Sequence, residues 1–168
     1  IKDKYIDEIL LFNDVNVFRK IKVTLLDFKA EVYTNLDKDS AVFLSQPLYL
    51  FMMKYELYLK LVVRELIILE KKHRKIFFKF HPRDTDLFKK MIFKKCSSNI
   101  TFIDNISIDK FFEQKKAYHA YSFYSSALYE LYKMGVKVNF LYRKTPELMH
   151  NTYLKNLDYI VKKIESNE

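Results

Sequence analysis

The sequence contains very little glycine, proline or cysteine. Among its 168 residues there are 1 Gly, 3 Pro and 1 Cys. A single cysteine excludes a disulfide framework within the chain, and no Cys/His cluster has the spacing of zinc ligands. The near absence of glycine excludes the glycine-rich loops of Walker and dinucleotide-binding proteins. Any phosphate must therefore be bound by side chains and helix ends.

Long hydrophobic runs are also missing. No stretch of about 18 apolar residues is present, so we expect no transmembrane helix, and the start has no signal-peptide pattern. The lone thiol, Cys96, fits a reducing compartment, and we expect it to be partly buried and inert. The chain begins at Ile1 without a methionine, which leaves open that it belongs to a longer protein with a further N-terminal domain.

Aromatic and basic residues are abundant. The chain holds 15 Phe and 13 Tyr, and 49% of its residues are hydrophobic, which is enough for one globular core. Its 30 Lys+Arg against 21 Asp+Glu give a formal charge of +9. This charge favours anionic partners, namely nucleotide phosphates, nucleic acid or an anionic membrane surface, and charge alone does not choose among them.

Apolar runs typical of strands alternate with helical patterns along most of the chain. Strands are expected at 6–12, 41–45, 77–80, 100–103, 117–121 and 136–142, and 17–32 can be helix or strand. Helices are expected at 54–72, 84–95, 107–114, 125–134 and from 145 onward. The alternation predicts an α/β fold with a Rossmann-like parallel sheet and helices on both faces. A polar break at 35–40 predicts a boundary between an N-terminal segment, 1–40, and a main domain, 41–168.

One strand-like run ends abruptly on His81, Pro82 and Arg83. The preceding residues 77–80 are mostly phenylalanine, and Pro82 cannot donate a hydrogen bond to a sheet, so the strand must stop there. Ligands of open α/β sheets bind at the carboxyl ends of the strands. A titratable ring beside a guanidinium at that edge indicates an anion site. The alternative is a histidine that merely ends the strand.

Two further strand ends carry polar residues. Ser45, Gln46 and Pro47 follow one strand, and Ser125 and Ser126 open the helix after another. Serines at a helix N-terminus offer hydroxyls together with unpaired backbone N–H groups, which bind phosphate. Serine is also a common helix cap, which explains such a pair without a ligand. Combined with the histidine and arginine described above, the pair favours a nucleotide phosphate.

Two Asp-x-Asp triplets, at 37–39 and 84–86, look like the metal-binding motif of nucleotide-sugar enzymes. Each lies among cations and neither belongs to an acidic cluster. We therefore interpret the first as a surface loop and the second as a helix cap, and we expect no metal or other cofactor. The remaining histidines, His73, His119 and His150, are isolated in the sequence and are explained by packing.

Three motifs in order resemble those of a known enzyme family. Residues 43–48 (FLSQPL), 79–84 (KFHPRD) and 122–128 (SFYSSAL) are similar to the ordered motifs of bacterial lipooligosaccharide-type sialyltransferases, the family 52 glycosyltransferases. The similarity covers roughly residues 41–142. It implies a metal-independent, inverting GT-B enzyme with two Rossmann-like halves. Residues 41–168 then form the half that holds CMP-sialic acid, and 1–40 an appendage or interdomain segment.

The resemblance also implies roles for single residues. His81 matches the histidine that contacts the CMP phosphate and acts as general acid toward the leaving group. Ser125 and Ser126 match a phosphate-binding serine pair. Asp109 stands where the family tends to show a glutamate near the nucleotide, and it is a candidate for hydrogen bonds to the ribose. Further candidates for substrate binding in the same motifs are Gln46, Pro47 and Arg83.

The general base is where the sequence departs from the family. Members usually carry an acidic residue a few positions after Gln-Pro-Leu, where it can deprotonate the acceptor hydroxyl, whereas residues 49–53 read YLFMM here. Glu56 is the nearest carboxylate downstream and is the candidate base. The alternatives are another group of the chain, a group from a further domain, or an altered activity.

The resemblance implies a glycosyltransferase that moves sialic acid from CMP-sialic acid to a terminal sugar of a lipooligosaccharide or capsule. The expected partners are the nucleotide-sugar donor and an oligosaccharide acceptor, without nucleic acid. The basic surface suits a cytoplasmic protein, with peripheral association at the inner face of an anionic membrane left open. A homodimer, and the activity of this segment alone, are also left open.

Two other functions remain alternatives at this point. A basic, aromatic-rich nucleic-acid-binding module would cluster its lysines and tyrosines on one solvent face. A non-catalytic nucleotide-sugar-binding subunit of the same fold would account for the missing carboxylate after Gln-Pro-Leu.

Overall fold

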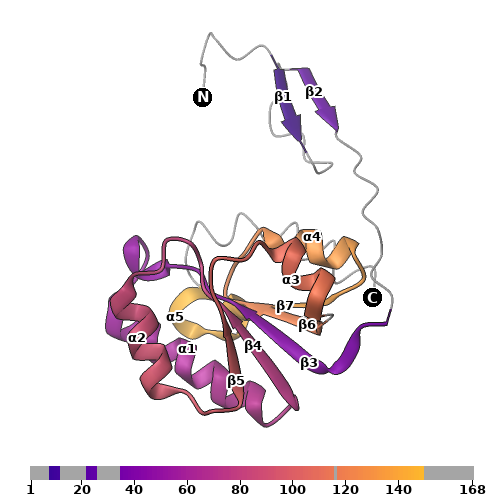
Figure 1. Cartoon of the computed structure of the whole chain (residues 1–168). Coiled ribbons are helices and arrows are strands. Elements are labelled where there is room, and N and C mark those ends of the chain that lie inside the picture. Colours follow the sequence, from indigo (N-terminus) through magenta and orange to yellow (C-terminus); the bar gives the residue numbers. More distant parts are fainter. Residues whose placement is uncertain (1–7, 12–21, 26–34, 116, 150–168) are drawn as a thin grey trace. The chain divides into compact units, whose positions relative to one another are not determined.

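The computed structural model describes residues 8–11, 22–25, 35–115 and 117–149 (Figure 1). The chain divides into two compact units, Ile1–Glu31 and Val32–Glu168. In the first unit, β1 (Glu8–Leu11) and β2 (Lys22–Leu25) form a parallel pair with Glu8 opposite Lys22. The predicted strand at 6–12 is therefore confirmed at its centre. Part of the ambiguous segment 17–32 is strand.

The second unit is built on a five-stranded parallel sheet. Its strands are β3 (Asp37–Leu44), β4 (Lys75–Lys79), β5 (Ile100–Ile103), β6 (Ala117–Ser122) and β7 (Lys137–Phe140). They lie in the order β5-β4-β3-β6-β7, so the chain runs outward from β3 to β5 and then crosses back to place β6 beside β3. The predicted Rossmann-like sheet is confirmed. The strand order reverses between β3 and β6, where ligands of such sheets bind.

Helices cover both faces of this sheet. α1 (Tyr55–Glu70), α2 (Asp86–Lys95) and the short α5 (Pro146–Met149) contribute to one core, together with Phe43 and Phe78 of the sheet. α3 (Ile108–Lys115) and α4 (Ala127–Lys133) contribute to a second core with Val42 and Phe77. Figure 1 shows the two groups of helices on opposite sides of the strands. Successive residues of a strand contribute to opposite cores, because their side chains point alternately to the two faces of the sheet.

Several element boundaries differ from the sequence-based expectation. β3 begins at Asp37, inside the predicted polar break, because Asp37 accepts hydrogen bonds from the Asp39 amide and the Ser40 hydroxyl and so pairs these polar groups locally. β7 ends at Phe140, and the following residues form a 3-10 helix, η2 (Leu141–Lys144), instead of continuing the predicted strand. A 3-10 helix after Pro47, η1 (Leu48–Leu50), was not predicted.

Other elements agree closely with the sequence patterns. α1 and β5 lie where the apolar periodicity places them, and Thr85 caps α2 by accepting a hydrogen bond from the Phe88 amide at 3.3 Å. Gly135 follows α4 with a positive φ of 83°, as a helix-ending glycine should. No helix in the described part of the chain is both long and apolar enough to cross a membrane.

Candidate functional site

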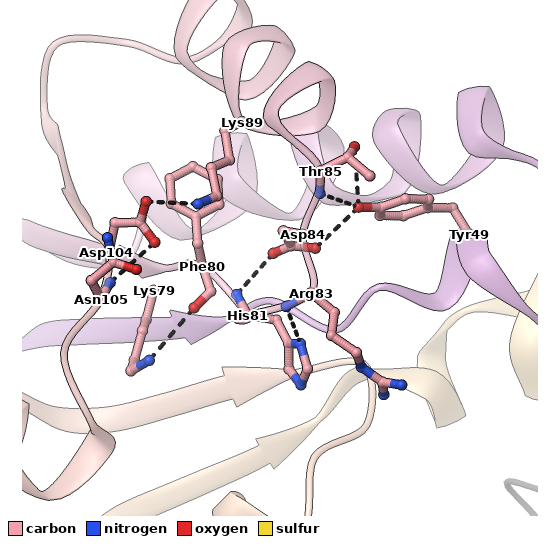
Figure 2. Close-up of polar contacts among 10 residues, drawn as sticks. All are labelled: Tyr49, Lys79, Phe80, His81, Arg83, Asp84, Thr85, Lys89, Asp104 and Asn105. Atoms are coloured by element: carbon pink, nitrogen blue, oxygen red, sulfur yellow. Dashed lines mark hydrogen bonds and ion pairs between the residues drawn. The ribbon is translucent and has the colours of Figure 1, made fainter.

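The residues of β4 alternate between the two faces of the sheet as the strand runs into the site. Phe78 and Phe80 belong to the core that includes α1 and α2, whereas Phe77 packs against α3. Lys79 and His81 continue on the face of Phe77, because side chains two residues apart point the same way. Figure 2 shows Lys79 and His81 pointing to the same side, opposite to the ring of Phe80.

A cavity of about 210 Å³ lies at this carboxyl edge of the sheet. Its wall combines the ends of β3 and β4 with the first residues of α3 and α4. The described residues that line it are Leu44, Ser45, Gln46, Lys79, Phe80, His81, Pro82, Ile108, Ser125, Ser126 and Ala127. The three strand ends that the sequence analysis singled out therefore meet at one cavity.

His81 is held by a tight turn that its own neighbours build. The backbone N–H of His81 donates to Asp84 Oδ2 at 2.8 Å, and the Asp84 amide donates to the His81 carbonyl at 2.9 Å. The backbone N–H of Arg83 donates to His81 Nδ1 at 3.1 Å (Figure 2). Both the backbone and the ring of His81 are thus fixed before any ligand arrives.

This geometry determines the protonation of the imidazole. Since Nδ1 accepts the Arg83 N–H, the hydrogen of the neutral ring sits on Nε2. Burial lowers the pKa of His81, Asp84 opposes this shift, and the charges of Arg83 and Lys79 lower the pKa further. At neutral pH His81 is therefore an uncharged ring with Nε2–H as its hydrogen-bond donor.

Asp84 is a buried carboxylate that stabilises the turn at His81 by accepting its backbone N–H. Besides the His81 amide it faces the Tyr49 hydroxyl, which lies 3.5 Å from Oδ1. Tyr49 in turn accepts the Thr85 N–H at 2.8 Å and so connects η1 to the start of α2. Burial raises the pKa of Asp84, while hydrogen bonds from Ser45 and His81 counteract that shift. The Asp-x-Asp triplet at 84–86 thus starts with a turn residue followed by a helix cap.

The end of β3 is fixed from the side of α1. The buried Tyr58 hydroxyl lies 3.3 Å from Ser45 Oγ and accepts the Gln46 N–H at 3.1 Å. On β6, the buried Ser122 hydroxyl donates to the Leu44 carbonyl at 2.9 Å. These contacts hold the carboxyl ends of β3 and β6 together where the strand order reverses.

The two serines before α4 have different environments. Ser125 is buried, and its hydroxyl accepts the Ala127 N–H at 3.3 Å, so capping explains this residue. Ser126 is exposed at the cavity wall, and its side chain makes no capping hydrogen bond. Both hydroxyls can still donate a hydrogen bond to a ligand, because Ser125 Oγ uses only an acceptor position for the Ala127 N–H.

Lys79 is a site residue that the sequence analysis did not select. Its side chain is half-buried at the cavity wall, and burial lowers the pKa of its ammonium group while Asp104 opposes the shift. Its Nζ lies 3.5 Å from the Phe80 carbonyl (Figure 2). The signal was present in the sequence, because Lys79 stands two positions before His81 on the same strand.

Three other predicted residues lie elsewhere, and the side chain of a fourth is not described. Arg83 and Glu56 are exposed, and neither is among the described residues that line the cavity; Glu56 belongs to the first turn of α1. Pro47 is buried beside η1 and is also absent from that lining. Asp109 belongs to α3, and its side chain lies outside the described part of the structure. Among the described side chains, the structure thus brings together His81, Gln46 and the serines, without Arg83, Glu56 and Pro47.

A pair of histidines and the single cysteine lie away from the cavity. The rings of His73 and His119 lie with centroids 4.6 Å apart and planes tilted by 49°, and His73 Nε2 lies 2.9 Å from the Tyr121 hydroxyl. Cys96 is half-buried, and burial raises the pKa of its thiol to about 11, as expected for an inert thiol. Among the described residues, no group of three or more His, Cys, Asp or Glu is placed to hold a metal ion.

Comparison with known families identifies the class of protein. Residues 2–160 match the model of a family described as alpha-2,8-polysialyltransferase (POLYST). No curated protein sequence matches the chain. The match extends over β1 to α5, so it includes every residue that lines the cavity. The prediction of a sialyltransferase-type family is confirmed: the chain belongs to the alpha-2,8-polysialyltransferase family, whose members are glycosyltransferases.

Proposed function

We propose that the chain binds CMP-sialic acid in the cavity at the carboxyl edge of its sheet and transfers sialic acid to a sugar acceptor. The observation that carries this proposal is the meeting of His81 Nε2, the Ser126 hydroxyl and the end of β3 at one cavity, beside the reversal of strand order. The side chains offer neutral hydrogen-bond donors, which suit a phosphate in a protein that has no glycine-rich loop to bind it. The family assignment supports sialic acid as the transferred sugar.

In the proposed reaction, the acceptor hydroxyl attacks the anomeric carbon of sialic acid from the side opposite the phosphate. The carbon–oxygen bond to CMP breaks, its electron pair stays on the phosphate oxygen, and the acceptor proton passes to a base. Negative charge grows on the leaving phosphate, so donors aimed at it stabilise the transition state. His81 supplies Nε2–H for this purpose, and Ser126 supplies its hydroxyl.

The donor role of His81 refines the general-acid role that the family resemblance implies. Full proton transfer needs an imidazolium, whose Nδ1–H would displace the hydrogen bond from the Arg83 amide. A phosphate monoester leaves readily as an anion when hydrogen bonds stabilise it. We therefore assign His81 as a neutral donor to the leaving group, in a reaction that needs no metal.

The base is proposed to lie outside the described cavity wall. No carboxylate is found among the described residues that line the cavity, and Asp84 is already engaged by the His81 amide. Glu56 is solvent-exposed on α1 and serves as base only if the acceptor reaches it. A second Rossmann-like half, as in GT-B enzymes, is the proposed source of the remaining acceptor-binding groups.

The acceptor is proposed to be a glycan of a capsule or lipooligosaccharide that ends in sialic acid. The family description names an α2,8 linkage between sialic acids, so donor sugar and acceptor end are chemically alike. Such a chain is a polyanion. The formal charge of +9 favours its approach to the protein and, equally, an anionic membrane that carries it.

Calorimetry with CMP tests the site. CMP should bind the protein in the presence of a metal chelator, and His81→Ala should weaken this binding by about 10-fold or more, the usual cost of a hydrogen bond to a charged group. The matched control is His73→Ala, which removes the same side chain from the segment that precedes β4, away from the cavity, and should leave CMP affinity unchanged. Unchanged affinity in His81→Ala would remove His81 from the site.

The reaction is tested with the full-length protein. Release of CMP from CMP-sialic acid, coupled to extension of a sialylated acceptor, is expected without divalent metal. Turnover that requires added metal would contradict the mechanism. Donor binding without turnover would instead favour a non-catalytic nucleotide-sugar-binding subunit, and salt-steep affinity for oligonucleotides without CMP binding would favour a nucleic-acid-binding module.

A further inference from the structure

Lys79 and His81 form a pair at the cavity wall. They are two residues apart at the end of β4, so their Cα atoms are separated by about 7 Å and their side chains point to one side. Both line the cavity, whose far wall carries Ser126. A ligand that contacts His81 with one group can therefore place a neighbouring group against the Lys79 side chain.

The charge of Lys79 has no counter-ion in the described structure. Asp104, the nearest acidic influence on its pKa, accepts an ion pair from Lys89 at 2.7 Å instead. The Lys79 ammonium has only a long contact of 3.5 Å to the Phe80 carbonyl. Since half-burying an unpaired cation is unfavourable, the position is poorly explained by folding alone.

Lys79 also gives the cavity its charge. Among the described residues that line the wall, it is the one with a permanent charge, because His81 is neutral and the others are polar or apolar. Arg83, the other cation of the motif, is exposed and contributes its backbone N–H to the His81 ring. The cavity therefore offers one cation beside a set of neutral donors.

The donor substrate carries anionic groups that match this arrangement of one cation beside neutral hydrogen-bond donors. In CMP-sialic acid the anomeric carbon carries both the phosphate oxygen and a carboxylate, so two anionic groups lie side by side. Nucleotides of neutral sugars lack the second group. We infer that Lys79 pairs with the sugar carboxylate, while His81 and Ser126 hold the phosphate, and that Lys79 thereby selects a sialic acid donor over a neutral-sugar nucleotide. This inference rests on the proposed function.

Binding of two ligands separates the roles of Lys79. The affinities of CMP, and of a fluorinated CMP-sialic acid analogue that cannot be transferred, are measured by calorimetry for the wild type, Lys79→Met and Lys79→Arg. In Lys79→Met the affinity for the analogue should fall by about 10- to 100-fold, as for a lost charged hydrogen bond, and the affinity for CMP should change by less than about threefold. Lys79→Arg should recover most of the loss.

Lys75→Met is the matched control. It removes the same charge from the amino end of the same strand, where Lys75 is exposed over the ring of Phe77, and should leave both affinities unchanged. Because Lys79 makes no ion pair with the described residues, Lys79→Met should unfold at the same urea concentration as the wild type or a higher one. This check shows that the variant is folded.

The outcomes separate the two proposals. An equal loss for CMP and the analogue in Lys79→Met, or no loss for either, overturns the inference while leaving the CMP site in place. A wild type that binds neither ligand overturns the proposed function itself.

Discussion

His81 is a histidine with one ring nitrogen already in use. The Arg83 amide occupies Nδ1, and the Asp84 carboxylate holds the backbone behind it. The remaining nitrogen faces the cavity as a donor in the neutral state. Fixing a donor in this way lowers the reorganisation needed when charge develops on a leaving group.

A glutamine at position 81 tests the neutral-donor role. Its side-chain amide can place an N–H near the position of Nε2 but cannot transfer a proton. We expect kcat/KM for CMP-sialic acid to fall by about 10²- to 10³-fold in His81→Ala, as for other transition-state donors, and substantially less in His81→Gln. If both variants lose the same activity, the ring acts by proton transfer, and the neutral-donor assignment is wrong.

At the residue scale, the sequence indicates the strand end that lines the cavity, but it does not indicate which cation lies at the cavity wall. Arg83 stands close to His81 in the motif and is the cation that the sequence suggests. Alternation along β4 places Lys79 on the face of His81, whereas Arg83 lies within the turn from His81 to Asp84, where alternation no longer applies. The separate duties of Ser125 and Ser126 depend on helix-end geometry, which adjacent identical residues do not reveal.

The segment between β4 and α2 combines a site residue with the start of a helix. Asp84 supports the His81 turn, while Thr85 accepts the Phe88 N–H and caps α2. Although adjacent, the two residues serve different elements. Their substitutions should therefore separate ligand binding from stability.

We predict that Thr85→Ala lowers the free energy of unfolding by about 1 kcal/mol, as for a lost N-cap, and leaves CMP affinity unchanged. Asp84→Asn should lower both the free energy of unfolding and the affinity for CMP. The neutral amide is a poorer acceptor for the His81 N–H, and the ring then loses its fixed position. Urea unfolding and CMP calorimetry on both variants measure the two effects. Full CMP affinity in Asp84→Asn would show that the turn does not position His81.

At the element scale, segments with a strong apolar periodicity could be predicted from the sequence. Segments that depend on local hydrogen bonds or on the path of a turn could not. α1 and β5 follow from their apolar periodicity. β3 starts among polar residues because Asp37 satisfies two neighbouring groups, and η1 depends on how the chain turns after Pro47. Composition alone does not reveal either arrangement.

The whole molecule carries neutral, partly buried histidines at more than one place. Burial lowers the pKa of His73, His81 and His119, and the His73–His119 contact lowers the pKa of His119 further. Lys72 and Lys137 also disfavour protonation of this pair, whereas Asp39 favours it at His73. The unfolded chain, whose histidines have an ordinary pKa of about 6.5, therefore binds more protons at mildly acidic pH.

We predict that the protein loses stability as the pH falls from 7.5 to 5.5. The contribution of these histidines is fully present above their unfolded pKa and is lost as the pH drops toward the folded values. The midpoint of urea unfolding, measured across this range, should fall less in His119→Gln than in the wild type. Raised pKa values, such as that of Asp84, act in the opposite direction. A midpoint independent of pH would contradict the prediction.

The alternation along β4 restricts how this protein can vary. One residue inserted or deleted within the strand would exchange its faces, sending Lys79 toward the aromatic core and the ring of Phe80 to the face that Lys79 and His81 now occupy. Substitutions at single positions do not change which residues of the strand point to which face of the sheet. Relatives should therefore tolerate changes of side chain along the strand and insertions in the loops on either side, whereas a change in its length should eliminate folding and ligand binding together.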